Sequence, residues 1–214
     1  MKVSAIVPAY NEAPRIGAVL EVLVGHPALS EVIVVDDGST DGTAASAARF
    51  SVRIVAHPSN RGKGASLQSG VSVSDAPVMF FCDADLVGLT PSFVEEVVCP
   101  VSSGHVDMFI GARASKTRHM LGFTYAPLLD GQRALTRELW DAVPCRYKRR
   151  FEIEAALNAV ARTSFSYEYR EFDISHVRKE DKWGRDGRRA RYHMYMDVAS
   201  VYLRARRGGE CAYA

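Results

Sequence analysis

The feature that most constrains this fold is a regular alternation, over the first hundred residues, of short apolar runs with segments of helical periodicity. The apolar runs lie at residues 3–7, 32–35, 52–55, 78–82 and 108–110. Between them are segments such as residues 15–24, in which apolar side chains recur at helical spacing. Strands that alternate with helices form βαβ units, and continuous apolar strands fit a sheet covered on both faces. The sequence therefore predicts an α/β fold with a mostly parallel, Rossmann-like sheet and helices on both faces.

Local signals place several helices and the elements of the second half. Ser39 or Thr40 can cap a helix that runs to Arg49, and Asp41 is favourable in its first turn. Pro91 takes the first-turn position of another helix, where proline is tolerated. The remaining predicted elements are a helix at 65–73, a loop at 113–129, helices at 134–143 and 152–161, a strand at 165–171 and a helical segment at 189–206.

Two acidic pairs come directly after two of the predicted strands. Asp36 and Asp37 follow one apolar run, and Asp83 and Asp85 follow another. The carboxyl ends of strands are where open α/β sheets bind ligands. Two carboxylates about 5 Å apart repel by roughly 3 kcal/mol at an effective dielectric near 20, and a bound cation or donor groups would offset this. Mg²⁺ takes carboxylate oxygens and often shares them with a substrate phosphate. Solvated turn formers or helix caps are the alternative reading.

The loop at residues 60–64, NRGKG, is suited to a phosphate-bearing ligand. Gly62 and Gly64 permit close approach of the backbone, and Lys63 supplies a cation. The loop is neither a Walker A motif nor a dinucleotide fingerprint, because Leu67 stands where the third glycine would be. A plain turn before a helix is the alternative.

Four motifs in this order resemble the family-2 glycosyltransferases with the GT-A fold. They are VPAYNEA at 7–13, VVDDGSTDGT at 34–43, NRGKGAS at 60–66 and DADL at 83–86. The resemblance covers roughly residues 1–115 and implies that this edge binds a nucleoside-diphosphate sugar. Its base and ribose would lie on residues 8–12, with Asp37 facing the base and Asp83 and Ala84 touching the ribose. Lys63 would lie near the base or the phosphates. The residues that the resemblance assigns to nucleotide-sugar binding are Pro8, Ala9, Tyr10, Glu12, Asp37, Lys63, Asp83 and Ala84.

The second half is similar to two subgroups, the polyprenyl-phosphate hexosyltransferases and the hexosyl-phosphoglycerate synthases. The resemblance implies that Asp85 and His176 hold Mg²⁺ or Mn²⁺ and that Asp85 serves catalysis through this ion. It places Glu152, in the segment FEIE, near the transferred sugar as a second catalytic residue. Arg133 either contacts the phosphate of an acceptor or pairs within the protein.

Two departures from these subgroups leave the acceptor open. Residues 87–89 replace the Gln and proline-rich turn that usually follow DADL in polyprenyl-phosphate enzymes, and residues 116–122 do not match the acceptor loop of the phosphoglycerate synthases. We expect a metal-dependent transfer of a hexosyl group to an anionic acceptor that bears phosphate or carboxylate, or to a polyprenyl phosphate. A nucleotide-sugar-binding module without turnover and a sugar-phosphate nucleotidyltransferase are the alternatives.

Charge divides the chain unevenly. Residues 1–145 hold 11 Lys and Arg against 15 Asp and Glu, whereas residues 146–214 hold 16 against 10. This asymmetry suggests that the two halves handle different chemistry. The resemblance, which covers roughly residues 1–115, implies that these residues form the nucleotide-sugar half of one domain and that residues 116–214 form the acceptor half with a basic helical extension. The mild net charge of +2 argues against nucleic acid as a partner. The segment at 189–206 could dock on the core, contact a second subunit in a homodimer, or lie on a membrane surface.

Cysteine usage and hydropathy indicate the compartment. The four cysteines, at positions 82, 99, 145 and 211, form no CxxC pair or metal-ligand spacing, so we expect reduced thiols. The first residues do not resemble a signal peptide, and no apolar run approaches the roughly 18 residues of a membrane span. We expect a cytoplasmic protein, with peripheral contact at the inner membrane face left open.

Overall fold

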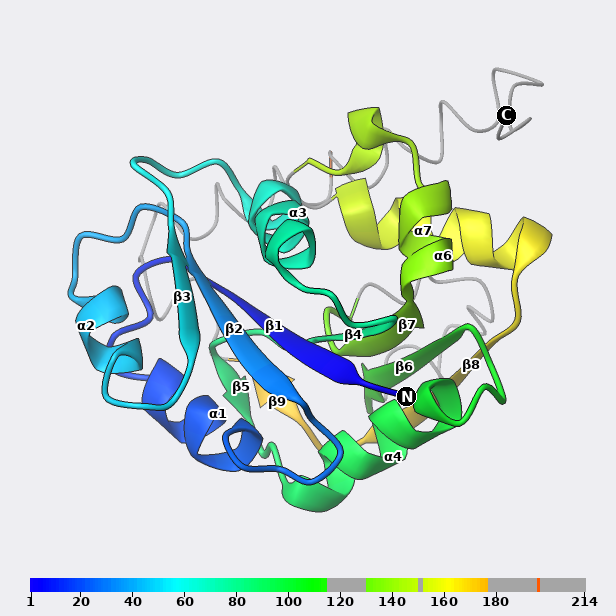
Figure 1. The fold of residues 1–214 in the computed structure, drawn as a ribbon, viewed down its shortest axis with the longest axis horizontal. Coiled ribbons are helices and arrows are strands. Elements are labelled where there is room, and N and C mark those ends of the chain that lie inside the picture. The colour runs from blue at the N-terminus through cyan, green and yellow to red at the C-terminus, as the bar shows by residue number, and fades with distance from the viewer. Residues whose placement is uncertain (115–129, 150–151, 177–195, 197–214) are drawn as a thin grey trace.

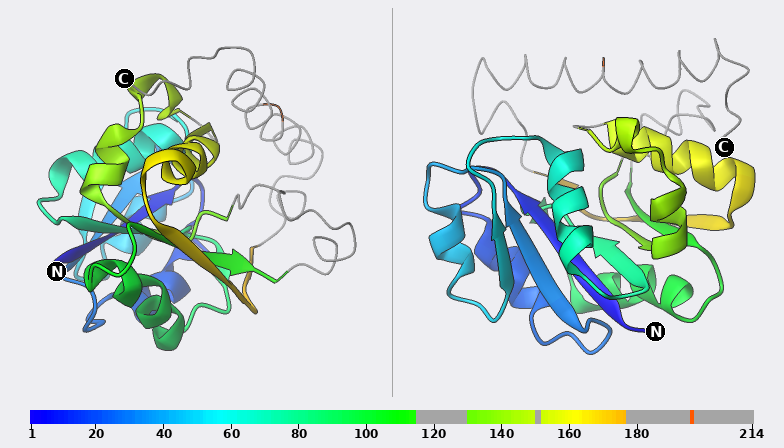
Figure 2. Two further views of the ribbon diagram at one scale, coloured as in Figure 1. Left: turned by 90° about the vertical axis from the view of Figure 1, so that its right-hand side faces the viewer. Right: turned by 45° about the horizontal axis from the view of Figure 1, so that its top comes forward.

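A seven-stranded sheet with helices on both faces forms the body of the protein (Figures 1 and 2). The computed structural model describes residues 1–114, 130–149, 152–176 and 196. The sheet has the order β3-β2-β1-β4-β7-β6-β8, and β5 and β9 form a separate two-stranded sheet. The strands are β1 (Val3–Ala9), β2 (Glu31–Asp36), β3 (Arg53–Ala56), β4 (Val78–Phe81), β5 (Leu86–Val87), β6 (Met108–Arg113), β7 (Arg133–Thr136), β8 (Tyr167–Phe172) and β9 (Ser175–His176).

The sheet is mostly parallel, as the alternation of strands and helices predicts. β1 pairs in parallel with β2 and β4, β2 with β3, and β6 with β8, whereas β7 runs antiparallel to both β4 and β6. The register sets Ala9 opposite Asp36 and Ile6 opposite Phe81. The segments that leave β1, β2 and β4 therefore start from one edge of the sheet.

Helices cover both faces of the sheet, and the sheet separates the apolar core into two layers (Figure 1). The helices are α1 (Ile16–Leu23), α2 (Thr43–Ala47), α3 (Lys63–Val73), α4 (Pro91–Ser102), α6 (Arg137–Ala142) and α7 (Glu152–Ser164), with a short 3₁₀ helix, η1 (Cys145–Tyr147). The apolar sides of α1, α2 and α4 pack on one face, and those of α3, α6 and α7 on the other. Side chains of β1 alternate between the layers, since Ala5 and Val7 join the first and Ile6 the second.

Most predicted elements are present, and α4 begins as expected. Pro91 is its first residue, and the Thr90 hydroxyl accepts a hydrogen bond from the Phe93 N–H at 3.2 Å. The predicted capping of α2 is wrong, because the helix starts at Thr43 and Gly42 is its N-cap without a side-chain bond. Ser39 and Thr40 instead bond to Asn11 in the turn after β1.

The predicted helix at 134–143 is wrong over its first three residues. Residues 133–136 form β7, which fills the gap between β4 and β6, and only then does α6 begin. Thr136 ends the strand and caps the helix, because its hydroxyl accepts a hydrogen bond from the Leu139 N–H. Pairing on both sides of β7 outweighs the helix propensity of Ala134 and Leu135.

The second half of the chain contributes β7 and β8 to the same sheet as the first half. The predicted boundary at residue 115 falls where the described residues break off, and it stays a prediction. Most of the predicted loop at 113–129 and most of the predicted helical segment at 189–206 lie outside the described residues. Cys82, Cys99 and Cys145 are free thiols. No helix in the described part of the chain is long and apolar enough to cross a membrane.

Candidate active site

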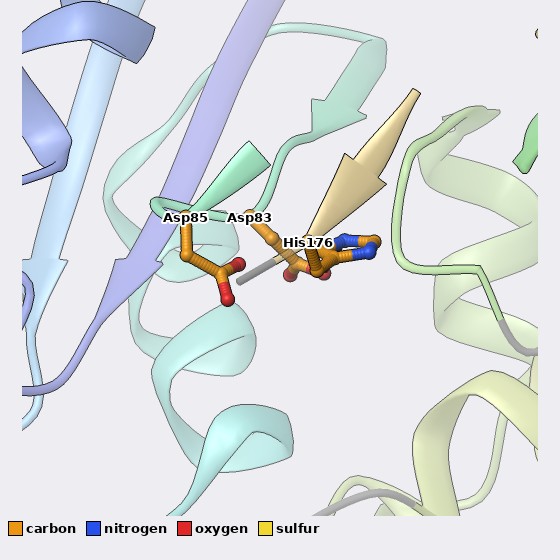
Figure 3. A group of neighbouring side chains, drawn as sticks. All are labelled: Asp83, Asp85 and His176. Carbon is orange, nitrogen blue, oxygen red and sulfur yellow. Dashed lines mark ion pairs between the residues drawn. The ribbon is translucent and has the colours of Figure 1, made fainter. Parts of the chain in front are cut away.

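Asp83, Asp85 and His176 meet at the carboxyl end of β4 (Figure 3). The two aspartates occupy the segment that leaves β4, and the chain then forms β5. β5 pairs antiparallel with β9, with Leu86 opposite His176, so a residue ninety positions away is brought to the aspartates. One potential ligand atom from each of the three side chains lies within 4.8 Å of the other two.

This group of side chains fits a divalent cation. All three residues are half-buried, and they offer two carboxylates and one imidazole. Opposite ligands of an octahedral ion at about 2.1 Å lie about 4.2 Å apart, so small side-chain rotations would bring the three atoms into range. Carboxylates suit Mg²⁺ and Mn²⁺, and a neutral imidazole nitrogen is a common transition-metal ligand.

Asp83 is held by three side chains of the protein. Its Oδ1 lies 2.6 Å from the Lys63 Nζ, and its Oδ2 lies 3.2 Å from the His176 Nε2 and accepts a hydrogen bond from the Gln132 Nε2 at 3.1 Å. Burial alone would raise the pKa of Asp83, but the charge of Lys63 and the hydrogen bonds outweigh it, so the pKa of this carboxyl lies well below its usual range. Asp83 therefore stays ionised.

His176 carries an opposing balance of effects. Burial lowers the pKa of His176, but the hydrogen bond and charge of Asp83 and the charge of Asp85 outweigh it and raise this pKa above its ordinary value. The proton is therefore retained to higher pH when no cation is bound. A metal ligand must be the neutral imidazole, so metal binding at His176 competes with this proton.

Lys63 bridges the acidic site to a helix of the second half. Its Nζ donates to the Glu154 Oε1 at 2.7 Å as well as pairing with Asp83. Burial disfavours the ammonium, but the charges of Asp83 and Glu154 outweigh it and raise the pKa of Lys63. Gly131 passes so close that a Cβ there would collide with the Lys63 Nζ and lie 2.5 Å from the Asp83 Oδ2. A larger residue at this position would displace the bridge.

Glu154 is a site residue that the sequence reasoning missed, because it chose Glu152. Both acids are in the first turn of α7. Residues two apart on an α-helix project about 200° apart, so the two cannot both face Lys63. Glu154 is the buried one that reaches Lys63, and Glu152 is half-buried. A sugar contact by Glu152 stays a prediction. The rotation of a helix about its axis is set by its tertiary packing, and the local sequence does not show which side of α7 faces Lys63.

Arg133 and Lys148 are turned into the protein. Arg133 is 1% exposed, and its guanidinium donates to the Asn158 side chain at 3.0 Å and to the Asp130 carbonyl at 2.7 Å. Arg133 therefore pairs within the protein, and its contact with the phosphate of an acceptor stays a prediction. Lys148, in the basic second half of the chain, places its ammonium over the Trp140 ring at 4.6 Å from the centroid.

Asp37 finds its partners within the chain. It is 3% exposed, and its carboxylate accepts hydrogen bonds from the His57 Nδ1 at 2.7 Å, the Arg61 N–H at 2.9 Å and the Gly62 N–H at 2.7 Å. Donor groups of the chain itself therefore offset the charge of Asp37. Its role toward a nucleotide base stays a prediction.

The turn after β1 is tied to the turn after β2. The Asn11 N–H donates to the Ser39 hydroxyl, and the Asn11 side-chain oxygen accepts from the Thr40 N–H, both at 2.9 Å. Asn11 has a positive φ of 56°, which is uncommon outside glycine. Glu12 is buried beside this turn and forms an ion pair with Arg15.

The structure places the predicted nucleotide-sugar residues on four segments. Pro8, Ala9, Tyr10 and Glu12 are at the end of β1, Asp37 follows β2, and Lys63 begins α3. Asp83 and Ala84 follow β4, but Ala84 is 2% exposed, so its side chain lies in the core. Of these residues, Lys63 and Asp83 are in direct contact.

The comparison with protein families gives a match to one family model. The model described as Glycosyl transferase family 2 matches residues 4–153. Among proteins similar in sequence, a dodecaprenyl-phosphate galacturonate synthase of Rhizobium johnstonii is 29% identical over 54% of this chain and 37% of its own length. A glucosyl-3-phosphoglycerate synthase of Mycolicibacterium paratuberculosis is 32% identical over 48% of this chain and 34% of its own. The chain thus spans little more than a third of the length of these relatives.

A solved structure extends the likeness to most of the fold. Glucosyl-3-phosphoglycerate synthase from Mycobacterium tuberculosis, in complex with Mn²⁺, UDP and glucosyl-3-phosphoglycerate, superposes with a TM-score of 0.72. The match covers 92% of this chain and 80% of that one at 24% identity. The same enzyme has been solved with Mg²⁺ and UDP. At this identity the likeness shows a shared fold.

Proposed function

The chain belongs to glycosyl transferase family 2, and on that premise we propose that it transfers a hexosyl group from a nucleoside-diphosphate sugar to an anionic acceptor with the help of a divalent cation. The fold is the GT-A-like α/β fold expected from the four motifs. Enzymes of this kind are hexosyltransferases. Because the chain matches only part of the relatives' length, its own donor, metal and acceptor are proposals.

The convergence of Asp83, Asp85 and His176 is the observation that carries the proposal. Three separate features bring them together, namely the end of β4, the turn before β5 and the pairing of β5 with β9. A merely solvated acidic turn needs neither a histidine from a distant strand nor a lysine held against it. The arrangement is what a diphosphate and its cation require.

We assign the cation, Mg²⁺ or Mn²⁺, to Asp85 and His176. Asp83 would contribute mainly through its hydrogen bonds and charge, since Lys63 and Gln132 already engage its oxygens. When bound, such an ion supplies Lewis-acid stabilisation of the negative charge that develops on the leaving diphosphate. The protein's part is to hold Asp85, directly before β5, close to His176 on β9, and to keep Lys63 charged nearby.

We assign the nucleotide to residues 8–12 and Asp37. The carboxylate of Asp37 has about four acceptor positions, and the chain occupies three of them. The remaining position, on Oδ2, suits an N–H donor on the edge of a base. The solved relative binds UDP, which carries such a group, so UDP-sugars are the first donors to test.

The acceptor is proposed from its chemistry. The relatives are named for phosphoglycerate and dodecaprenyl phosphate, and both acceptors carry a phosphate. Where the phosphate itself is the nucleophile, as in a polyprenyl phosphate, it is already ionised at neutral pH, so its oxygen needs little help from a general base. This fits a site in which the Asp83 carboxylate is already engaged with Lys63, Gln132 and His176.

The proposal is tested by a donor screen followed by a transfer assay. Thermal stability of the protein is measured with each nucleotide-sugar, with and without Mn²⁺ or Mg²⁺. One donor should raise the melting temperature only with the cation. Asp85→Ala should abolish this shift, while Asp75→Ala, at an exposed acid outside the group of three, should retain it.

Transfer is then followed with the labelled donor and either 3-phosphoglycerate or a short polyprenyl phosphate. Donor binding that never leads to product with any phosphate acceptor would favour a binding module. Formation of a nucleotide-sugar from a sugar phosphate and a nucleoside triphosphate would instead favour a nucleotidyltransferase. Absence of any donor response would refute the proposal.

A further inference from the structure

We propose that His57 is a positioning residue for the turn at residues 60–63, acting through Asp37. The part of this inference that concerns nucleotide binding at the turn rests on the proposed function. The positioning of the turn by His57 does not. The inference concerns Asp37 directly after β2, His57 directly after β3, and Ser69 on α3, none of which is in the group of three potential metal ligands.

His57 links three elements of the fold through both of its ring nitrogens. The Nδ1 lies 2.7 Å from the Asp37 Oδ1, and the Nε2 lies 2.9 Å from the Ser69 hydroxyl. The His57 N–H also donates to the Asp36 carbonyl at 2.9 Å, which fixes the residue at the end of β3. His57 is 8% exposed, so its ring nitrogens have little access to water as a replacement partner.

The chemistry of the partners settles how the ring is used. An ionised carboxylate only accepts hydrogen bonds, so the His57 Nδ1 carries a proton and donates it to Asp37. The Ser69 hydroxyl can donate or accept, and it suits the Nε2 in either protonation state. With both nitrogens engaged, the imidazole is locked against rotation, and it holds Asp37 in one orientation.

Asp37 passes this constraint to the turn that precedes Lys63. Its two oxygens accept from the Arg61 and Gly62 N–H groups. Gly62 has a φ of 88°, a conformation that few other residues adopt, and Lys63 follows it directly. The turn carries Lys63 to Asp83 and Glu154. A chain of hydrogen bonds therefore runs from Ser69 on α3 through His57 and Asp37 to Gly62, the residue directly before α3.

The turn has little room to settle elsewhere. A Cβ on Gly38, the residue after Asp37, would lie 2.6 Å from the backbone of Ser59, so the turn after β2 is pressed against the one after β3. α3 is equally close to the sheet, because a Cβ on Gly70 would collide with the Ile6 side chain. Ser69 is therefore a fixed anchor. Without His57, the Asp37 carboxylate loses the partner that ties it to this anchor.

The test compares two substitutions, each of which retains one of the two hydrogen bonds of the His57 ring. The amide nitrogen of Asn lies near the position of imidazole Nδ1, and that of Gln lies near Nε2. His57→Asn should keep the hydrogen bond to Asp37. His57→Gln should lose that hydrogen bond and keep the one to the Ser69 hydroxyl. His26→Gln is the matched control, because His26 is also 8% exposed and bonds two backbone groups in another part of the fold.

The first readout is amide hydrogen exchange of Arg61 and Gly62 in the ligand-free protein. His57→Gln should speed exchange at these amides about tenfold, the effect of losing roughly one hydrogen bond to a charged group. His57→Asn and His26→Gln should leave both amides close to wild type. Unchanged exchange in His57→Gln, or equal acceleration in His26→Gln, would overturn the proposal whatever the protein's substrate is.

The second readout is the affinity for UDP with Mn²⁺. We expect His57→Gln to weaken UDP binding about tenfold. His26→Gln should have a similar melting temperature but bind UDP with the wild-type affinity. Equal weakening in both variants would show a general stability effect and contradict the positioning role. If wild-type protein binds no UDP, the proposed donor fails, and the exchange experiment still decides the role of His57.

Discussion

Replacing Lys63 by Met is expected to destabilise the protein strongly, because it leaves two buried carboxylates facing one another. The Lys63 Nζ lies 2.6 Å from Asp83 and 2.7 Å from Glu154, and the three side chains are 13%, 19% and 7% exposed. Removing one partner of a buried ionic group typically costs about 3–5 kcal/mol. Met preserves most of the apolar stem, so the loss reports mainly on the charge.

The repulsion that remains can be bounded from the same distances. The two carboxylate oxygens are each bonded to one nitrogen, so they lie no more than about 5.3 Å apart. At an effective dielectric near 20, this separation corresponds to a repulsion of about 3 kcal/mol. A closer approach of the two oxygens would increase this repulsion, so adding Glu154→Gln to Lys63→Met should recover part of the lost stability, on the order of 3 kcal/mol.

The assay is urea unfolding of wild type, both single variants and the double variant near neutral pH, where all three groups are charged. Lys2→Met, at an exposed lysine, controls for the change of residue type. We expect the double variant to be more stable than Lys63→Met alone. A cost below about 1 kcal/mol for Lys63→Met, or strictly additive effects of the two changes, would refute the reasoning.

Three further outcomes follow from the described contacts. Gly131→Ala should push Lys63 and Asp83 apart and lower the free energy of unfolding by about 1–3 kcal/mol, measured in urea; an unchanged midpoint would contradict the close approach. Burial raises the pKa of Asp83, but Lys63 and the hydrogen bonds lower it by more, so the net shift is below the ordinary value of 3.8. The ionised Asp83 carboxylate therefore stabilises the fold above pH 3.8, and this stabilisation is lost as the pH falls below that value. Acid unfolding of Asp83→Asn should accordingly be less steep than that of wild type, and parallel curves would count against the ion pair. Thr90→Ala should cost about 1 kcal/mol by removing the cap on the Phe93 N–H, and a loss below about 0.3 kcal/mol would show that the cap is dispensable.

The sequence predicted the fold and the edge of the sheet where the site lies. This part succeeded because the apolar runs at 3–7, 32–35 and 78–82 are strands buried on both faces, whose pattern needs no tertiary information. The position of Asp83 and Asp85 after β4 follows from the same pattern. The four motifs then led to the family that the family model shows.

The contacts within the site could not be predicted in the same way. The choice of Glu154 over Glu152 depends on the rotation of α7, and the position of β7 depends on the two strands that it joins. His57 carried no motif, and its role follows only from the approach of β2, β3 and α3. Gln132 was passed over as part of the segment around Arg133, although its amide lies against Asp83 and His176.

The central claim is that Asp85 and His176 hold a divalent cation beside Asp83, where a nucleoside diphosphate binds. Pulsed electron paramagnetic resonance of Mn²⁺ with UDP and the tag-free protein tests this most directly. The account predicts coupling to one imidazole nitrogen and to phosphorus, with the nitrogen coupling lost in His176→Ala. Bound Mn²⁺ without nitrogen coupling in wild type, or with coupling that persists in His176→Ala, would contradict it.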